Sequence, residues 1–334
     1  MSNTLRYNNT IPNNIYYGGS TVQNVYYNNT KVWSASRPFS FTYTGAYETE
    51  GNLEGNFVIR FKTSGTLTIT NHGNTNGLYD VFLVGGGAGG TDTKHPEFNN
   101  AVSSCGGGGG GYTKIDKRIS LSSSIYVTVG SGGAANTNGG NSSISDISVS
   151  GGNIGIRKRY NTSTMGSYYT CILGGNGGSG GGTGCYENYN YGATQNNCNG
   201  GSNGNNGHGA YSKVAGYNNI PGGSGQGSTT REFGESTGKL YAGGGGGAYL
   251  YMQNDGGMSS NLNTGIGVDG GGNGLFYSYL YSQTTNRIAT SALANTGSGG
   301  GGGSEIYYSM SQDGLTNGNA GAGGSGIVCI RNAR

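Results

Sequence analysis

Hydrophobic and polar residues alternate in several short stretches of the first half of the chain, and this pattern predicts β-strands. In Phe57–Lys62 the apolar side chains occupy every second position and two cations fall between them, which is the period of a half-buried strand. Gly65–Thr70 and Ser124–Gly130 repeat the alternation, and Tyr79–Val84 is typical of a more buried strand. No window shows a helical period. Short strands at this spacing predict an all-β fold, an antiparallel jelly-roll-like sandwich with essentially no α-helix.

The order of these strands predicts a long insertion. Strands fill residues 39–150, and one more, Ser325–Arg331, lies at the C-terminal end of the chain. That last strand must return to the sheet. A structureless loop of the roughly 170 residues in between would be improbable in a compact domain. We therefore predict one domain over residues 37–334 with an ordered insertion at approximately 151–324.

Residues 1–36 contain a short repeat that predicts two β-hairpins. Ile15–Val22 and Val25–Val32 each read as strand, two-residue turn, strand, with Gly-Gly or Asn-Asn at the turn. A lone hairpin is only marginally stable in water. We therefore expect this segment to attach to the main domain, to another copy of itself or to a larger assembly.

Glycine supplies 74 of the 334 residues, about three times its usual share. Such runs either form flexible linkers or pack side by side as polyglycine II helices, in which each backbone N–H bonds a neighbouring run. Because the insertion is expected to be ordered, we predict the second. The predicted scaffold glycines are Gly106, Gly107, Gly108, Gly109, Gly110, Gly111, Gly243, Gly244, Gly245, Gly246, Gly247, Gly299, Gly300, Gly301, Gly302 and Gly303.

Motifs for catalysis, cofactors and metals are scarce. The glycine runs match no phosphate-binding loop, and Thr91–Pro96 excludes the helix that a dinucleotide site needs after Gly85–Gly90. The three histidines lie far apart, and the net charge of +3 is spread thinly. We therefore expect no cofactor, no metal and no nucleic-acid partner. No apolar stretch is long enough to cross a membrane, and the N-terminus lacks the pattern of a signal peptide.

Two groups of side chains leave alternatives open. Glu232 and Glu235 could form a paired-carboxylate site for glycan cleavage, but an ion pair between Arg231 and Glu232 that anchors the loop is the expectation, and we predict that the protein is not an enzyme. Cys329 is expected to be a small buried residue. Cys185 and Cys198 flank a Tyr/Asn-rich stretch that a disulfide could close, although an odd count of cysteines favours reduced thiols.

Tyrosines concentrate in the polar loops expected between the glycine runs. Tyr, Ser, Gly and Asn also dominate antibody loops, where tyrosine supplies rigid contact area and Asn and Ser supply adaptable hydrogen bonds. Alternatively, the tyrosines pack against the sandwich or a neighbouring subunit, which is the expectation for Tyr249 and Tyr251. The receptor-binding candidates are Tyr160, Tyr168, Tyr169, Tyr186, Tyr189, Tyr191, Tyr277, Tyr279 and Tyr281.

Several segments of the chain carry a resemblance to a known family. They are Phe39–Tyr47, Val84–Gly90, Gly110–Tyr112, Ile125–Gly133, Gly139–Ser143, Thr229–Glu235, Tyr241–Gly247 and Ala322–Val328. Over about residues 39–334 the chain resembles glycine-rich domains of tail-tip and other secreted or surface proteins of bacteria and their phages. The layout is similar to the glycine-rich extracellular domain of anaplastic lymphoma kinase, in which a jelly roll carries polyglycine II helices.

This resemblance implies a function. Residues 26–33 look like the joining segment of phage tail proteins from Gram-positive hosts, and adhesins at the tips of T-even-type tail fibres are similar in composition. The resemblance implies a receptor-binding adhesin of a phage tail fibre or tail tip, located in the virion and extracellular when it functions. Expected partners are a host cell-surface glycan or protein, other tail proteins through residues 1–36, and further copies of the chain, a trimer being favoured. The alternative is a structural virion or surface-assembly protein whose tyrosines lie at subunit interfaces.

Overall fold

The computed structural model describes most of the chain and contains β-strands, irregular segments and two short 3-10 turns. The described residues are 15–17, 20–22, 24–27, 29–34, 38–92, 103–161, 168–188, 194–196, 211–213, 230–252, 265–280, 283–305 and 317–334. Within these ranges no residue is α-helical, as predicted, and no helix there is long and apolar enough to cross a membrane. The 3-10 turns are η1 (Gly73–Thr75) and η4 (Glu232–Gly234).

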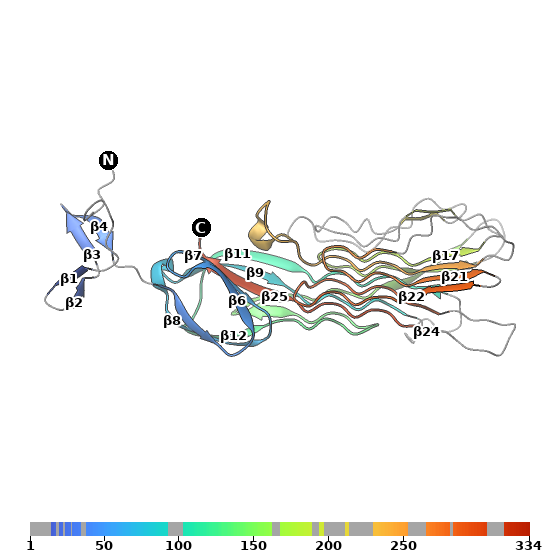
Figure 1. Ribbon diagram of the computed structural model, residues 1–334, viewed down its shortest axis with the longest axis horizontal. Helices are drawn as coiled ribbons and strands as arrows, with labels where there is room; N and C mark the ends of the chain where they lie inside the picture. The colour runs from blue at the N-terminus through green and yellow to red at the C-terminus, as the bar shows by residue number, and fades with distance from the viewer. Residues whose placement is uncertain are drawn as a thin grey trace.

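Two five-stranded antiparallel sheets pack face to face, which confirms the predicted all-β sandwich (Figure 1). The first, called the β9 sheet, has the order β11 (Thr113–Ser120), β9 (Leu78–Val84), β25 (Ile327–Asn332), β7 (Asn56–Phe61), β6 (Tyr47–Asn52). The second, called the β8 sheet, has the order β14 (Ile147–Val149), β13 (Ser142–Ile144), β12 (Ser124–Thr128), β8 (Gly65–Asn71), β5 (Ser40–Tyr43). The C-terminal strand β25 returns between β9 and β7, as the strand order required. The jelly-roll path stays a prediction.

The core lies between the two sheets and follows the alternation of the sequence. Every second residue of β7, from Phe57 to Phe61, is buried. Phe39 stacks on Phe57 with ring centroids 4.7 Å apart and meets Tyr79 edge to face. Each large side chain buried in this way contributes about 1.5–3 kcal/mol to folding, so this sandwich supplies the main hydrophobic core.

The glycine-rich segments leave the sandwich together and run side by side as long wavy traces (Figure 1). We call this set of segments the glycine bundle. Some of them precede residue 151, so the bundle draws on loops of the sandwich as well as on the long insertion. Its members are residues 85–92, 105–112, 130–141, 150–155, 174–184, 241–248, 265–275, 288–303 and 319–326.

Hydrogen bonds between these segments repeat every three residues. The N–H of Gly107 donates to the carbonyl of Gly182, and that of Gly110 donates to Ser179 on the same neighbour. The residues in between donate to two other neighbours: Gly108 and Gly111 to Gly300 and Gly297, and Gly109 and Tyr112 to Asn153 and Ser150. A three-residue repeat is the period of a polyproline II-type helix without internal hydrogen bonds. The assignment of the runs as polyglycine II stays a prediction.

The packing of the bundle leaves no room for side chains along these runs. All residues of Gly106–Gly111, Gly243–Gly247 and Gly299–Gly303 are buried. A Cβ built on Gly111 would lie 1.9 Å from the carbonyl oxygen of Gly85, and one on Gly247 would lie 2.1 Å from that of Thr183. Buried backbone with its amides bonded to neighbouring segments is ordered structure. The flexible-linker alternative is therefore wrong for these three runs.

A segment of the insertion, residues 230–242, folds back over the outer face of the β9 sheet, and we call it the clasp. Phe233 and Tyr241 of the clasp pack against Phe82 of β9, with ring centroids 6.1 and 5.6 Å away. Together with Cys329 of β25 they belong to a second buried apolar cluster. Cys329 is fully buried, as predicted. The central strand β9 is consequently buried on both faces, which is why Tyr79–Val84 is nearly continuously apolar.

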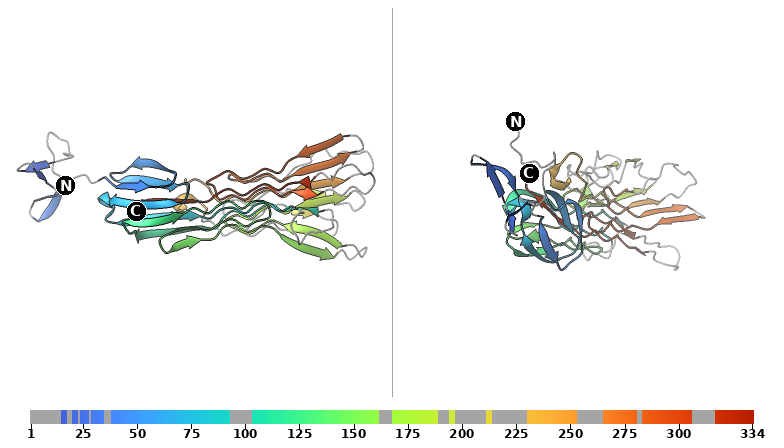
Figure 2. Two further views of the ribbon diagram at one scale, coloured as in Figure 1. Left: turned by 90° about the horizontal axis from the view of Figure 1, so that it is seen from below. Right: turned by 60° about the vertical axis from the view of Figure 1, so that its left-hand side comes forward.

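The elongated molecule has the sandwich near its middle (Figures 1 and 2). Two N-terminal hairpins, β1–β2 and β3–β4, lie beyond the sandwich on the side away from the bundle. They confirm the predicted repeat and have the bounds β1 (Ile15–Tyr17), β2 (Ser20–Val22), β3 (Asn24–Tyr27) and β4 (Thr30–Ser34). At the other end the glycine bundle opens into further short strands.

Candidate binding surface

The strands at the far end of the glycine bundle, which we call the distal strands, form four small sheets (Figure 2). Three of these contain two or three strands. They comprise β15 (Ile156–Asn161) with β16 (Tyr168–Leu173), β18 (Thr194–Asn196) with β19 (Tyr211–Lys213), and β10 (Ser103–Ser104) with β23 (Ser304–Glu305) and β24 (Asn317–Gly318). The fourth has the order β17 (Cys185–Asn188), β20 (Tyr249–Met252), β21 (Phe276–Leu280), β22 (Gln283–Arg287).

In the four-stranded sheet, β17, β20 and β21 are parallel, which the sequence did not predict. All three of these strands follow directly from bundle segments: 174–184 precedes β17, 241–248 precedes β20 and 265–275 precedes β21. Parallel strands need a long crossover between them. Here the glycine bundle forms part of each connection. Bundle segments that lie side by side and run in the same direction continue directly into strands that lie side by side and are parallel.

Six of the nine candidate tyrosines lie on these distal strands, so their placement in loops was wrong. Tyr160 is on β15, Tyr168 and Tyr169 on β16, Tyr186 on β17, and Tyr277 and Tyr279 on β21. The aromatic residues of these strands suit a pleated, half-buried surface, whereas the surrounding glycine and asparagine favour loops. Tyr189, Tyr191 and Tyr281 lie outside the described residues.

The register places three candidates on one face of the four-stranded sheet. Tyr186 is level with Leu250, which is level with Tyr277, and Tyr279 follows two residues later on β21. Residues two apart on a strand, and residues paired across strands, share a face. Tyr249 and Tyr251 alternate with Leu250 and therefore belong to the opposite face. The register thus separates the tyrosines expected to bind from the two expected to pack.

The β15–β16 hairpin places two further candidates opposite each other. Tyr160 pairs with Tyr169, and Tyr168 pairs with Asn161 one residue further along. Tyr168 is consequently on the other face of the hairpin. Aromatic pairs directly across an antiparallel ladder typically stabilise such a ladder by roughly 0.2–1 kcal/mol.

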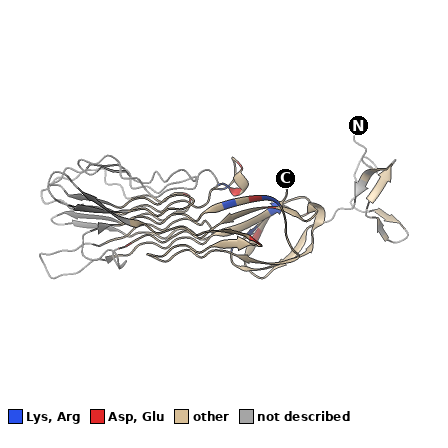
Figure 3. Ribbon diagram, turned by 180° about the vertical axis from the view of Figure 1, so that it is seen from behind, with Lys and Arg blue, Asp and Glu red and all other residues tan. Residues whose placement is uncertain are grey.

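The residues coloured as charged in Figure 3 lie on the sandwich and the clasp. The Glu232 carboxylate accepts hydrogen bonds from Nε and Nη2 of Arg60 at 2.6 and 2.9 Å. The predicted pair with Arg231 is wrong, because Arg231 donates to the carbonyl of Gly238 instead. Arg60 comes from β7, far away in sequence, and only the folding of the clasp onto the sheet brings the two together.

The second carboxylate of the clasp is also held by a cation. Glu235 accepts a hydrogen bond from Nη1 of Arg331 at 2.5 Å. Arg331 also donates from Nε to the buried Asp80, and its guanidinium lies 4.3 Å from the ring centroid of Phe233. The hydrogen bond and charge of Arg331 lower the pKa of Glu235. A glycosidase acid needs a raised pKa, so Glu235 is unsuited to that role. Both carboxylates act as anchors of the clasp.

The lowered pKa of Glu235 predicts acid sensitivity of the clasp. A carboxyl whose pKa is lower in the folded state adds stability at neutral pH, and this is lost as the pH falls through the folded pKa. We expect the thermal midpoint to drop below about pH 4.3, the usual glutamate value, and to drop less steeply in Glu235→Gln. Thermal unfolding between about pH 3 and 7 measures this.

Glu54 provides the matched control for this titration. It belongs to no ion pair among the described residues, so Glu54→Gln should keep the acid sensitivity of the natural chain. Identical pH profiles for Glu235→Gln and the natural chain would contradict the anchoring role of Glu235.

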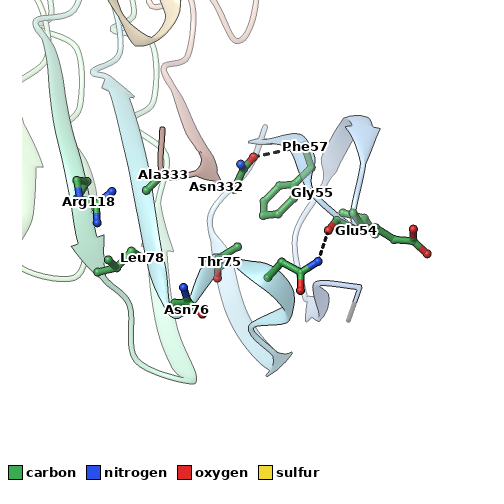
Figure 4. A pocket seen from close by; sticks show the side chains of 11 residues that line it. Glu54, Gly55, Phe57, Thr75, Asn76, Leu78, Arg118, Asn332 and Ala333 are labelled. Atoms are coloured by element: carbon green, nitrogen blue, oxygen red, sulfur yellow. Dashed lines mark hydrogen bonds between the residues drawn. The ribbon is translucent and has the colours of Figure 1, made fainter. Parts of the chain in front are cut away.

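A small pocket lies at the end of the sandwich, between the turn that follows η1 and the C-terminal residues (Figure 4). Two of its amides are hydrogen-bonded within the fold: Asn74 donates to the carbonyl of Glu54, and Asn332 accepts the N–H of Phe57. Arg118 lies at its edge. We assign no ligand to this pocket.

Metal-binding and disulfide chemistry find little support in the described residues. No group of three or more His, Cys, Asp or Glu side chains there could hold a metal ion. Cys105 and Cys329 are buried, and neither is part of a disulfide. Cys185 begins β17, whereas Cys198 lies outside the described residues, so their disulfide stays a prediction.

The fold and its glycine-stacked bundle define the class of protein to which the chain belongs, a β-sandwich extended by ordered glycine runs. A family model described as a glycine-rich domain matches residues 62–333. The chain therefore belongs to the glycine-rich domain family. Neither the curated proteins nor the solved structures yield a match.

Proposed function

We propose that the protein is a receptor-binding adhesin of a phage tail fibre or tail tip. One observation carries the proposal: Tyr186, Tyr277 and Tyr279 share one face of a sheet at the end of the molecule opposite the N-terminal hairpins. An adhesin needs an attachment end and a recognition end held apart by something stiff. The hydrogen-bonded glycine bundle, interpreted as polyglycine II helices on a jelly roll, supplies that spacer.

The chemistry of the tyrosine face supports recognition of a cell-surface glycan or protein. Its other members in register are Asn188, Leu250, Met252, Thr284 and Asn286. Aromatic rings with neighbouring hydroxyl and amide groups provide contact area and adaptable hydrogen bonds. Binding would require no chemical step, in keeping with a protein that is not an enzyme and uses no cofactor.

The attachment end fits a role in assembly. Tyr16, Tyr17, Tyr26 and Tyr27 of the N-terminal hairpins are all exposed, from 60 to 84%. Exposed aromatic residues on two-stranded sheets are typical of surfaces that a partner covers. In the proposal this partner is another tail protein. Copies of the chain associate, with a trimer favoured. The protein resides in the virion and functions outside the cell.

Binding of the purified full-length protein to intact bacteria and to arrayed surface polysaccharides tests the proposal. We expect Tyr277→Ala/Tyr279→Ala to weaken binding at least about tenfold, because buried aromatic anchors carry most of the energy of an interface. The matched control is Tyr17→Ala/Tyr126→Ala, which removes two exposed tyrosines, 84 and 61% exposed, far from the distal strands. It should bind as the natural chain does.

The competing function, a structural component of a virion or surface assembly, predicts a different result. In that case the tyrosines would fill subunit interfaces, and the Tyr277→Ala/Tyr279→Ala variant would no longer assemble into larger particles. Neither the natural chain nor the variant would bind bacteria. That outcome would contradict the adhesin proposal.

A further inference from the structure

We propose that the β15–β16 hairpin binds a phosphate-bearing anionic polymer of the cell surface, a proposal that rests on the adhesin function and names the ligand of one part of it. The observation is a run of three cations, Arg157, Lys158 and Arg159, on a strand that also carries the candidate Tyr160. No other three consecutive residues of the sequence are all basic.

The register leaves these cations without an opposite charge across the strand pair. Arg157, Lys158 and Arg159 pair with Ile172, Cys171 and Thr170, all of which are uncharged. Like charges gathered without acidic partners raise the local positive potential, and this attracts anions. In this respect the hairpin differs from strands of the sandwich on which cations form ion pairs with carboxylates.

The sandwich shows what cations with a structural role look like in this protein. Arg60, Lys62 and Arg331 each lie within 4 Å of a carboxylate of the sandwich or the clasp. The formal charges of these groups are thereby compensated within the fold. The basic run on β15, by contrast, is paired across the ladder with uncharged residues only.

Position and pairing favour access to this hairpin. β15 and β16 form a two-stranded sheet at the distal end of the bundle, and no third strand in the described part of the chain pairs with either. Ile156, the first residue of β15, is 60% exposed. A polymer can therefore lie along the strand.

The residue types select the ligand class. Arginine donates two parallel hydrogen bonds to one phosphate group, and two arginines on alternate residues of a strand recur about 6.6 Å apart on one face. Lys158 shares the other face with Tyr160 and Tyr169. A chain of phosphate groups joined by polyol or sugar units would meet cations on the strand and aromatic rings beside them.

Binding of purified poly(glycerol phosphate) to the full-length protein tests the inference. We expect binding to weaken at least tenfold between about 50 and 200 mM salt, because contacts to a charged polymer release counterions. Arg157→Gln/Lys158→Gln/Arg159→Gln should lower the affinity at least about tenfold at low salt. Neutral dextran should not bind to this hairpin, and DNA should bind more weakly than poly(glycerol phosphate).

A matched control removes the same charge from the sandwich. Lys114→Gln/Lys117→Gln/Arg118→Gln neutralises three exposed cations of β11 and should bind poly(glycerol phosphate) within about twofold of the natural chain, since the ligand site lies beyond the screening distance. Unchanged thermal midpoints for both triple variants show that folding is intact. Equal losses in the two variants would mean that only net charge matters, and would overturn the inference.

The remaining outcomes separate this inference from the proposed function. If the β15 triple variant binds poly(glycerol phosphate) as the natural chain does, or if DNA binds as tightly, the inference fails. If that variant still binds intact bacteria while Tyr277→Ala/Tyr279→Ala does not, the adhesin function stands and the hairpin has no part in it. If the natural chain binds no bacteria but still binds the polymer, the adhesin proposal fails while the phosphate site remains.

Discussion

Gly299→Ala is expected to lower the free energy of unfolding by about 3–5 kcal/mol. A Cβ at this position would lie 1.9 Å from the carbonyl oxygen of Gly108. The N–H of Gly299 donates to Gly243, and its carbonyl accepts from Gly272, so the residue is bonded to neighbours on more than one side. Overpacking costs about 1–3 kcal/mol, and each buried backbone group left without a partner costs about 1–3 kcal/mol more.

Gly55→Ala is the matched control for this substitution. A Cβ on Gly55 would meet nothing within 4 Å, and this glycine lies in an exposed turn of the sandwich. Its replacement should change stability by less than about 0.5 kcal/mol. Equilibrium unfolding in urea measures both variants. Similar stabilities for Gly299→Ala and Gly55→Ala would show that the glycine runs are loosely packed, and the bundle could then not serve as a spacer.

Arg60→Met is expected to cost about 3–5 kcal/mol, because it leaves a buried carboxylate without its partner. The Glu232 side chain is 7% exposed and receives two hydrogen bonds from Arg60, whose own side chain is 13% exposed. The hydrogen bond to Glu232 raises the pKa of the Arg60 guanidinium. Loss of the cation should release the clasp from the β9 sheet.

A second variant distinguishes a lost ion pair from lost packing. Arg60→Met/Glu232→Met removes both charges, and replacement of a buried pair by apolar residues is often close to neutral. We expect it to recover most of the stability lost in Arg60→Met. Urea unfolding of the two variants measures this recovery, and equal deficits in the single and double variants would contradict the ion-pair explanation.

Much of the sandwich was predictable from the sequence. Alternation in Phe57–Lys62 and Ser124–Gly130 predicted which residues face the core, because a half-buried strand places every second side chain inside. The return of β25 followed from strand order. The parallel pairing of β17, β20 and β21 was not predictable. It depends on which glycine segments lie side by side, and runs of identical glycines do not specify their neighbours.

The candidate site was only partly predictable. Aromatic and polar composition identified the right tyrosines to consider, but it could not show that Tyr186 and Tyr277 share a face or that Tyr249 lies on the other. That assignment depends on hydrogen bonds between β17, β20 and β21. The partner of Glu232 was missed for a similar reason. Arg60 lies on β7, far from the clasp in sequence, and no residue near Glu232 indicates that the two side chains meet.

The sequence by itself determined that the protein is all-β and that its glycine runs have to be ordered, because alternation and composition are local properties of the chain. Only the tertiary structure decided which runs bond to each other, where the clasp docks and which tyrosines share a surface. Glycine has no side chain with which to specify a neighbour. The choice of neighbours is therefore made by the strands that hold the runs at either end.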